Sequence, residues 1–296
     1  MPKLSTDLAI RALVFTIFTT AICVDLNAQS AKAQTEGPAY RTGDARLNPA
    51  YSKSGSENEA ATPIVKALNI AEDTLQYIRT DIRDYTATMI KRERVDGLVG
   101  DAEFIDIKIR NEREAENIPF SIYMKFKKPA NIKGREVLWV EGRNGNKLTA
   151  HEGTGLLKHI TADLDPDGTM AMRGNRYPIY EAGIENLTFR LIEKGQRDKE
   201  IGDAEVKFFN KIKINGRECT LIQVKHPTER KEYDFHICRV FIDKELNVPV
   251  RYAAYDWPEE KGNKPALMEE YTYLNMKLNQ GLTDADFDRN NSKYNF

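Results

Sequence analysis

The sequence predicts an α+β fold in which about nine to eleven antiparallel strands form a curled half-barrel with helices in its concave face. Three observations predict it. One helical pattern begins the folded part, many segments with alternating apolar and polar residues follow, and a second helical pattern interrupts them once. A sheet of this size with one apolar face must cover that face, and two helices can do so if the sheet curls around them. A hydrophobic cavity remains wherever the helices do not fill the interior.

Residues 1–33 have the pattern of a signal peptide. Lys3 and Arg11 accompany an apolar run over 12–24, which is too short to span a bilayer but suits the apolar centre of an export signal. Small residues mark two cleavage sites, after Ala28 or after Ala33, and the second fits the A-x-A pattern better. We therefore expect an exported protein of the periplasm or cell envelope.

Two further features concern the region before the folded part. Lipidation at Cys23 stays open, although the residue before a lipidated cysteine is normally small and here it is Ile22. Residues 34–59 are polar and small without periodicity, which predicts a flexible linker. Over 60–296 no internal repeat and no second polar linker is visible, so we expect a single domain.

The folded part begins with an amphipathic helix over about 63–83. Thr62 followed by Pro63 is a helix-start signal. Apolar residues then recur at steps of three and four, as one stripe along a helix requires. The stripe consists of Ile64, Leu68, Ala71, Leu75, Ile78 and Ile82. A second helical pattern starts at Tyr180 and is expected to stop near Gly195.

Elsewhere the apolar period changes to two, which predicts antiparallel strands with one apolar face. The strands cover about 85–97, 103–110, 118–129, 134–142, 204–214, 218–226, 233–241, 248–258 and 268–281. The residues expected on the apolar faces that could line a hydrophobic cavity are Phe120, Ile122, Met124, Phe126, Trp139, Leu274, Met276 and Leu278. Ordinary core packing is the alternative, because pockets and cores use the same residue types.

Cys219 and Cys238 remain after the expected cleavage, and an even number of cysteines in an exported chain permits a disulfide. They lie in neighbouring predicted strands, and a turn centred near Thr228 and Glu229 sets them almost opposite each other. A disulfide is therefore our prediction. Two buried thiols are one alternative, and a metal site that adds His236 is another, although closed metal sites usually have four ligands.

Motifs for catalysis are weak in this sequence. From Glu57 onward the serines are Ser121 and Ser292, and neither lies in a nucleophile motif. His151 and His159 are separated by two glycines and by twice the spacing of the helical zinc motif. No glycine-rich phosphate-binding pattern occurs. We predict no enzymatic activity, no catalytic residue, no metal and no cofactor.

The stretch from Asp163 to Gly168 resembles the start of a calcium loop, because aspartates alternate along it. The twelfth position of such a loop needs a glutamate, and Gly174 occupies it here. The preceding residues favour a strand rather than the helix that the loop requires. We interpret the stretch as a tight turn at the rim of the barrel, with weak calcium binding as the alternative.

The charge balance excludes one class of partner. The chain has 44 Lys and Arg and 45 Asp and Glu, with both signs interspersed. Nucleic-acid binding needs a basic stripe or patch, and none is visible. We therefore expect no nucleic-acid partner.

Ordered motifs span nearly the whole folded part: "YTATMIKRERVDG", "KPANIKGREVLWVEG", "LDPDG", "RYPIYEAGIENL", "VRYAAYDWP" and "EEYTYLNMKLNQGLTDADFD". Over about Ile64 to Phe296 the sequence resembles a family of exported bacterial proteins known as a domain of unknown function. More distantly, the layout is similar to the LolA/LolB-like superfamily. Its members are half-barrels with helices in the mouth, and they include periplasmic lipoprotein carriers, the outer-membrane lipoprotein receptor and sensor domains of the RseB type.

The resemblance implies a non-enzymatic envelope protein that binds an acyl chain, a lipid or a lipidated partner, with peripheral contact to the membrane. Methionines among the candidate cavity residues fit this interpretation, because flexible thioethers accommodate varied acyl shapes. The alternative is an envelope sensor or protein-interaction module with a filled core and no lipid ligand. The sequence leaves the oligomeric state open.

Overall fold

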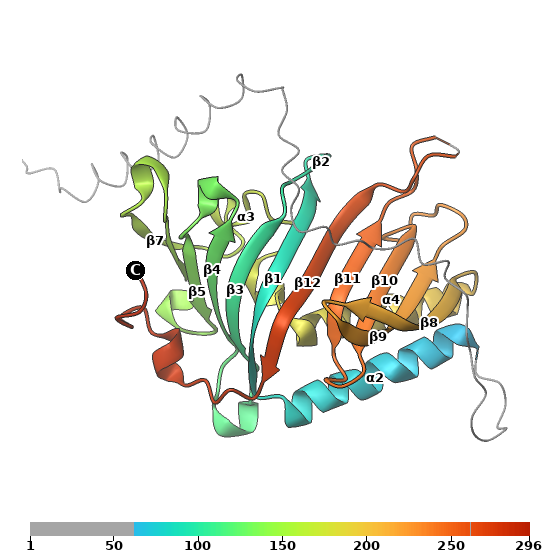
Figure 1. The fold of residues 1–296 in the computed structure, drawn as a ribbon, viewed down its shortest axis with the longest axis horizontal. Coiled ribbons are helices and arrows are strands. Elements are labelled where there is room, and N and C mark those ends of the chain that lie inside the picture. The colour runs from blue at the N-terminus through green and yellow to red at the C-terminus, as the bar shows by residue number, and fades with distance from the viewer. Residues whose placement is uncertain (1–61, 261) are drawn as a thin grey trace, which may run out of the picture. The chain divides into compact units, whose positions relative to one another are not determined.

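The computed structural model describes residues 62–260 and 262–296, so the expected signal peptide and linker lie outside the described residues. One antiparallel sheet runs through the described part of the chain, and it curls without closing (Figure 1). Helices pack on one of its faces. The predicted fold class, a curled antiparallel half-barrel with helices in its concave face, is confirmed.

The elements have the following bounds. The helices are α2 (Pro63–Asp81), α3 (Thr169–Met172) and α4 (Ile184–Ile201). The strands are β1 (Asp84–Val95), β2 (Leu98–Val99), β3 (Glu103–Arg110), β4 (Ser121–Lys128), β5 (Glu136–Val140), β6 (Leu148–His151), β7 (Thr161–Leu164), β8 (Glu205–Ile214), β9 (Arg217–Lys225), β10 (Ile237–Asp243), β11 (Pro249–Tyr255) and β12 (Leu267–Leu278). Short 3-10 turns connect several of them at Glu114–Glu116, Ala130–Ile132, Asn144–Asn146, Gly155–Leu157, Ile179–Glu181 and Asp284–Phe287.

The order of strands across the sheet is β7-β6-β5-β4-β3-β1-β12-β11-β10-β9-β8, and β2 pairs with β1 beside this path. Leaving β2 aside, neighbours in the sheet follow each other along the chain, apart from one junction, and β7 and β8 form the two edges of the sheet. At that junction β1 pairs with β12, so that the first and the last long strands of the sheet lie side by side (Figure 1). This pairing joins two meanders into one surface.

Cross-strand pairing decides which residues share a face. Tyr85 pairs with Ile109, Ile109 with Ile122, and Ile122 with Trp139. On the other side of the junction the same face continues through Tyr271, Tyr252, Val240 and Ile222. Residues 173–183, which we call the segment before α4, pack on these residues together with both long helices. We call this side of the sheet the helix-covered face.

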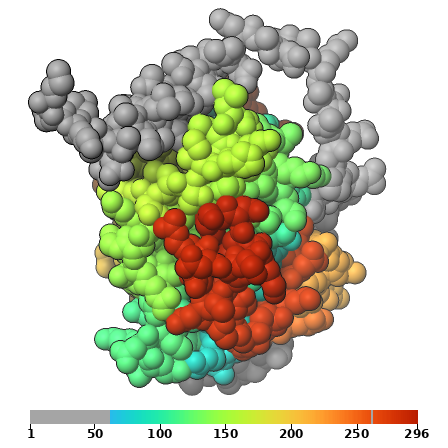
Figure 2. Space-filling view, turned by 90° about the vertical axis from the view of Figure 1, so that its left-hand side faces the viewer, coloured from blue at the N-terminus to red at the C-terminus, as the bar shows by residue number. Residues whose placement is uncertain are grey.

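The opposite face of β4 and β5 is covered by residues 282–296 (Figure 2). Tyr294 stacks on Tyr123 with ring centroids 4.0 Å apart. Glu136 lies fully buried below this segment and pairs with Lys125 at 2.7 Å. Burial opposes the charge of this carboxyl, but the hydrogen bond from Lys125 holds the pKa of Glu136 below its usual value. The residues after β12 are therefore part of the packed core.

The first helix agrees with its prediction, and the predicted end of the second helix is wrong. α4 passes through Gly195 and ends at Ile201, where Gly202 adopts a φ of 84° as a helix-ending glycine does. A Cβ atom at position 195 would lie 2.9 Å from a methyl carbon of Leu68 in α2. Gly195 therefore marks a close contact between the two helices and not the end of α4.

The start of α4 is fixed to the sheet by a buried tyrosine. The backbone N–H of Ile184 donates to the hydroxyl of Tyr85 at 3.0 Å, and both residues are fully buried. Gly183 has a φ of 107°, and a Cβ atom there would lie 3.0 Å from the same hydroxyl oxygen. A glycine is needed at this position for both reasons. The hydroxyl satisfies one of the N–H groups that every helix leaves free at its start.

The regular alternation expected along the last strand was wrong. Asn275 has a φ of 53°, and the pairing of β12 with β1 shifts next to it. Leu274 lies opposite Thr88, whereas Leu278 lies opposite Tyr85. Since Thr88 and Tyr85 are an odd number of residues apart on β1, Leu274 and Leu278 lie on opposite faces of the sheet. A bulge adds one residue to a strand and so reverses its alternation.

The predicted disulfide between Cys219 and Cys238 is also wrong. Cys219 lies opposite Asp243 in the β9–β10 hairpin, and Cys238 lies opposite Val224. Asp243 follows Cys238 by five residues along the chain, an odd number, so the two cysteines lie on opposite faces. Both are buried free thiols.

The hairpin loop explains this error. Tyr233 and Phe235 were expected in the second strand, but both side chains are buried in the loop and pack against the ring of His226. The strand β10 therefore begins at Ile237.

Among the described residues no group of three or more His, Cys, Asp and Glu could hold a metal ion. Cys219 and Cys238, on opposite faces of the sheet, are not placed to share a ligand set with His236.

The stretch from Asp165 to Gly168 forms the expected tight turn. The N–H of Gly168 donates to the carbonyl of Asp165 at 2.9 Å, and Asp167 accepts a hydrogen bond from Tyr180 at 2.6 Å. Asp163 pairs with Arg289 on the C-terminal segment at 3.3 Å. The aspartates are thus engaged in separate contacts.

No helix in the part of the chain that the structure describes is long and apolar enough to cross a membrane.

We predict that both thiols are unreactive in the folded protein. Burial raises the pKa of Cys219 to about 11 and that of Cys238 further, so neither forms the nucleophilic thiolate at neutral pH. In a Cys23→Ser variant, a colorimetric thiol reagent should find no fast-reacting group in the native protein and two after unfolding. An unfolded, unreduced chain without any thiol would instead prove a disulfide.

Candidate ligand-binding site on the helix-covered face

An apolar pocket of about 70 Å³ lies between α2, α4 and the helix-covered face of β9 and β10. The two helices contribute residues one turn apart, and the strands contribute alternate residues, so their side chains meet in one space. The apolar wall consists of Ile64, Ala67, Leu68, Ala71, Leu191, Ile222, Val224, Phe235, Cys238, Val240 and Ile242. The pocket therefore offers an apolar ligand aliphatic contacts on both sides.

A second pocket of about 330 Å³ lies beside the first, and its walls combine charged and hydroxyl groups with apolar side chains; we call it the polar pocket. It is formed by the segment before α4, by α4 itself, by the β9–β10 loop and by β11 and β12. Its lining consists of Arg176, Tyr177, Lys194, Asp234, Phe235, Tyr252, Ala254, Met268 and Glu269. Lys194 and Phe235 line both pockets. The two pockets therefore adjoin, and the second contains most of the charged groups.

Two buried glutamates lie at the junction of the two meanders. Glu93 of β1 and Glu269 of β12 are direct cross-strand partners on the helix-covered face. They are 8% and 3% exposed. Like charges directly opposite each other destabilise a sheet, and burial increases the cost of each charge. The pair therefore requires partners from outside the sheet.

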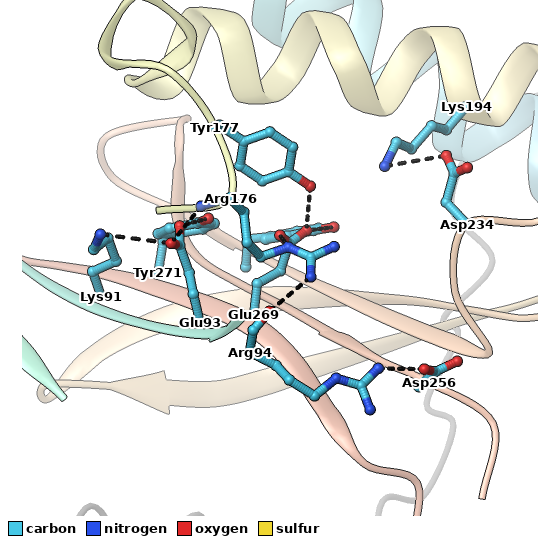
Figure 3. Close-up of polar contacts among 11 residues, drawn as sticks. Lys91, Glu93, Arg94, Arg176, Tyr177, Lys194, Asp234, Asp256, Glu269 and Tyr271 are labelled. Atoms are coloured by element: carbon cyan, nitrogen blue, oxygen red, sulfur yellow. Dashed lines mark hydrogen bonds and ion pairs between the residues drawn. The ribbon is translucent and has the colours of Figure 1, made fainter. Parts of the chain in front are cut away.

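Arg176 provides the central partner of this glutamate pair (Figure 3). Its backbone N–H donates to Glu93 at 3.0 Å, and its Nε donates to Glu269 at 2.9 Å. Its Nη1 donates to the backbone carbonyl of Arg94 at 3.0 Å. One residue of the segment before α4 thus contacts both carboxylates and the backbone of β1. This arrangement fastens the segment to the sheet.

Three tyrosines and a lysine complete the cluster. Tyr271 donates to Glu93, and Tyr252 and Tyr177 donate to Glu269 at 3.0 and 3.3 Å. Burial, and then the neighbouring glutamates, raise the pKa of each tyrosine, so all three remain hydrogen-bond donors at neutral pH. Lys91 lies 3.6 Å from Glu93 and 3.2 Å from Glu103. Both glutamates of the pair are therefore fully engaged.

A second ion-pair group lies on the other wall of the polar pocket (Figure 3). Asp234 of the β9–β10 loop lies 2.7 Å from Arg197 and 3.3 Å from Lys194, and both cations come from α4. Burial opposes the charge of this carboxyl, but Arg197 and Lys194 hold the pKa of Asp234 below its usual value. This group fixes α4 to the loop.

A buried Asp–His pair closes the apolar pocket at the same loop. Asp198 lines the pocket, and its carboxylate lies 3.0 Å from Nε2 of His226. The other ring nitrogen of His226 donates to the carbonyl of Phe235 at 2.7 Å. His226 stacks on Tyr233 with a centroid distance of 3.7 Å. The loop and α4 are thus joined by contacts at both pockets.

The eight candidate cavity residues lie in or against the core. Ile122, Phe126, Trp139 and Leu274 are buried. Phe120, Met124, Met276 and Leu278 are partly buried and pack against the largest core cluster. None of the eight lines either of the two pockets described above. That they line a ligand cavity stays a prediction.

Sequence reasoning missed the polar cluster. A signal was present, because Lys91 and Glu93 continue the apolar phase of Tyr85, Ala87 and Met89 along β1. Charged residues in the buried phase of a strand must be paired, and this points to a buried polar group. The partner Arg176 could not be found in this way, since it comes from an irregular segment.

The class of protein is therefore an open antiparallel half-barrel with two adjoining pockets under its helices. Residues 82–296 match the family described as "Protein of unknown function (DUF1571)", and this is more than half of the chain. The chain belongs to this family, as the resemblance in its sequence motifs indicated. No curated protein matches the chain.

Several solved structures are similar in fold at low sequence identity. A putative outer membrane lipoprotein-sorting protein domain from Vibrio parahaemolyticus is 15% identical with a TM-score of 0.36, over 77% of this chain and 98% of that one. A LolA superfamily protein from Nitrosomonas europaea is 12% identical with a TM-score of 0.30, over 75% and 97%. The MucA/MucB complex from Pseudomonas aeruginosa matches at 11% and 0.44, over 75% and 60%.

We predict that Arg176→Gln lowers the free energy of unfolding by roughly 2–4 kcal/mol, because it removes the guanidinium that pairs with the buried Glu269, while the backbone contact to Glu93 remains. Urea unfolding measures the loss. Arg173→Gln, at an exposed position of the same segment, is the control and should stay within about 0.5 kcal/mol of the wild type.

Adding Glu269→Gln to Arg176→Gln should recover much of the lost stability, since the second change removes the charge that the first leaves without its guanidinium. If Arg176→Gln behaves like its control, or if the double variant is the less stable of the two, the glutamate pair does not depend on Arg176.

Proposed function

We propose that this protein binds an amphiphilic ligand, namely an acyl chain, a lipid or a lipidated partner, and that it does so in the cell envelope without catalysing a reaction. The observation that carries the proposal is the pair of adjoining pockets. One has aliphatic walls and the other has charged and hydroxyl groups, and Lys194 and Phe235 belong to both. An amphiphile has the same division into an apolar and a polar part.

The size of the apolar pocket adds a requirement. A cavity of about 150 Å³ is known to hold one benzene molecule, and this pocket is about half as large. A long acyl chain therefore fits only if α2 moves away from β9 and β10. α2 packs chiefly on α4. The polar contacts between the two helices include an exposed ion pair of Arg79 in α2 with Glu185 in α4, at 2.8 Å. Such a pair is weak, so it would not prevent the movement.

The energetics permit this opening. Burial of a chain of about 16 carbons contributes on the order of 10 kcal/mol at about 0.8 kcal/mol per methylene, before ordering costs. Opening the pocket exposes part of the apolar stripe of α2, in which Leu68, Leu75 and Ile78 are buried. A bound chain would cover the same surface again. The gain from the ligand therefore offsets most of the cost of moving the helix.

The location in the envelope is supported by the signal-peptide pattern over 1–33. The absence of catalysis is supported by the state of the buried carboxylates. Glu269 accepts hydrogen bonds from Arg176, Tyr177 and Tyr252, which leaves it poorly suited to act as a base or nucleophile.

A second candidate function has one observation in its favour. The small volume of the apolar pocket also fits a sensor or protein-interaction module whose interior is already filled. In that case α2 and α4 keep their positions and the protein recognises a partner by its surface.

We predict that Ala71→Leu weakens acyl binding strongly while preserving the fold. Ala71 lines the apolar pocket from α2, and leucine is almost as good a helix former as alanine, so the larger side chain fills the pocket at little cost. Displacement of a fluorescent fatty acid should show an affinity at least tenfold weaker than in the wild type, with an unchanged or higher melting temperature.

Asn69→Leu, at an exposed position of α2, is the matched control and should bind like the wild type. If Ala71→Leu and Asn69→Leu bind the fatty acid equally well, the acyl chain does not occupy this pocket. A wild-type protein that binds no probe at all favours the filled-core module.

A further inference from the structure

The polar pocket suggests which headgroup the amphiphile carries, and this inference rests on the proposed function. Lys194 lies at the boundary, because it lines both pockets. Its side chain is 24% exposed and comes from α4 above the sheet (Figure 3). A headgroup in the polar pocket that continues into a chain in the apolar pocket must pass this residue.

Lys194 is the cation of this pocket whose side chain can leave its present ion pair and turn toward a ligand. Its contact with Asp234 is 3.3 Å long, whereas Arg197 lies 2.7 Å from the same carboxylate. If Lys194 turns toward a ligand, Asp234 keeps a close charged partner in Arg197. Arg176 is less free, since its Nε and Nη1 are held by Glu269 and by a backbone carbonyl.

The state of the charged residues around the pocket favours an anion. In the lining, Arg176 and Lys194 balance Asp234 and Glu269 in number, and Arg197, outside the lining, adds a further cation beside Asp234. Neither carboxylate is available to a cationic headgroup, because Glu269 already accepts from three donors and Asp234 is shared by two cations.

We propose that the polar pocket binds the anionic headgroup of the amphiphile, a phosphate or a carboxylate, and that Lys194 is the residue that pairs with it. Tyr177 and Tyr252 form the neighbouring wall. Their rings can pack beside the first carbons after the headgroup while their hydroxyls remain bonded to Glu269. An ion pair in a partly enclosed site discriminates against ligands of the wrong charge more than it adds affinity.

The test compares four ligands with the same 16-carbon chain: hexadecyl phosphate, palmitate, hexadecanol and hexadecyltrimethylammonium. Each displaces a fluorescent fatty acid from the full chain, below its micelle concentration. We expect at least one anion to bind about tenfold more tightly than hexadecanol, and the ammonium to bind more weakly than hexadecanol. Phosphate and palmitate together show which anion the pocket prefers.

Lys194→Met keeps the length and the apolar stem of the side chain but removes its charge. It should reduce the preference for the anion over hexadecanol, taken as the ratio of the two affinities in the same variant, to about twofold or less. Lys199→Met, at an exposed position of the same helix, is the matched control and should keep the preference. Inorganic phosphate alone should compete poorly, since it lacks the chain; strong competition would mean a site for free phosphate and overturn the headgroup proposal.

The failures are distinguishable. If hexadecanol and the anions bind equally to the wild type, the headgroup proposal is wrong and chain binding stands. If Lys194→Met keeps the preference, the assignment of Lys194 is wrong. If none of the four ligands displaces the probe, the proposed function fails and the headgroup proposal fails with it.

Discussion

The pairing of β1 with β12 is the contact on which the rest of the structure depends. It joins two meanders into one sheet and sets Glu93 directly beside Glu269 on the buried face. Two adjacent buried carboxylates cannot persist without donors, so the pairing requires Arg176 and the tyrosines around it. Arg176 fixes the segment before α4, and α4 in turn supports α2. The position of the pockets follows from this order of contacts.

The two long helices are held with different strength, and this difference connects the fold with the proposed function. α4 is tied to the sheet and to the β9–β10 loop by Tyr85, by Asp198 with His226, and by Arg197 with Asp234. α2 rests on α4 through apolar packing at Gly195 and a few exposed polar contacts, and its last turn, at the buried Ile78, is tied to the segment after β3 by Arg113. Under the proposed function, a ligand would displace α2 while α4 continues to position the charged groups of the polar pocket. An interior that opens on one side only gives the ligand a defined orientation.

The sequence was sufficient to predict the architecture, because the positions of helices and strands depend on the periodicity of apolar residues. The period of α2 and the alternation in the strands gave the helices, the curled sheet and its buried face. Features that depend on single residues were not accessible. The bulge at Asn275 reverses one strand, the packed loop with Phe235 moves the cysteines out of register, and Gly195 serves packing in a place where a helix end was expected. The site itself needed Arg176 from an irregular segment, which no pattern in one sequence links to two distant strands.

The most direct test of the central claim is native mass spectrometry of the protein isolated without detergent from the envelope of its own host. The structure predicts a population of chains that carry one adduct with the mass of an anionic lipid or acyl group, released when the apolar pocket is filled by Ala71→Leu. A bare protein mass from the envelope, together with an Ala71→Leu spectrum that is identical to the wild type, would contradict the account.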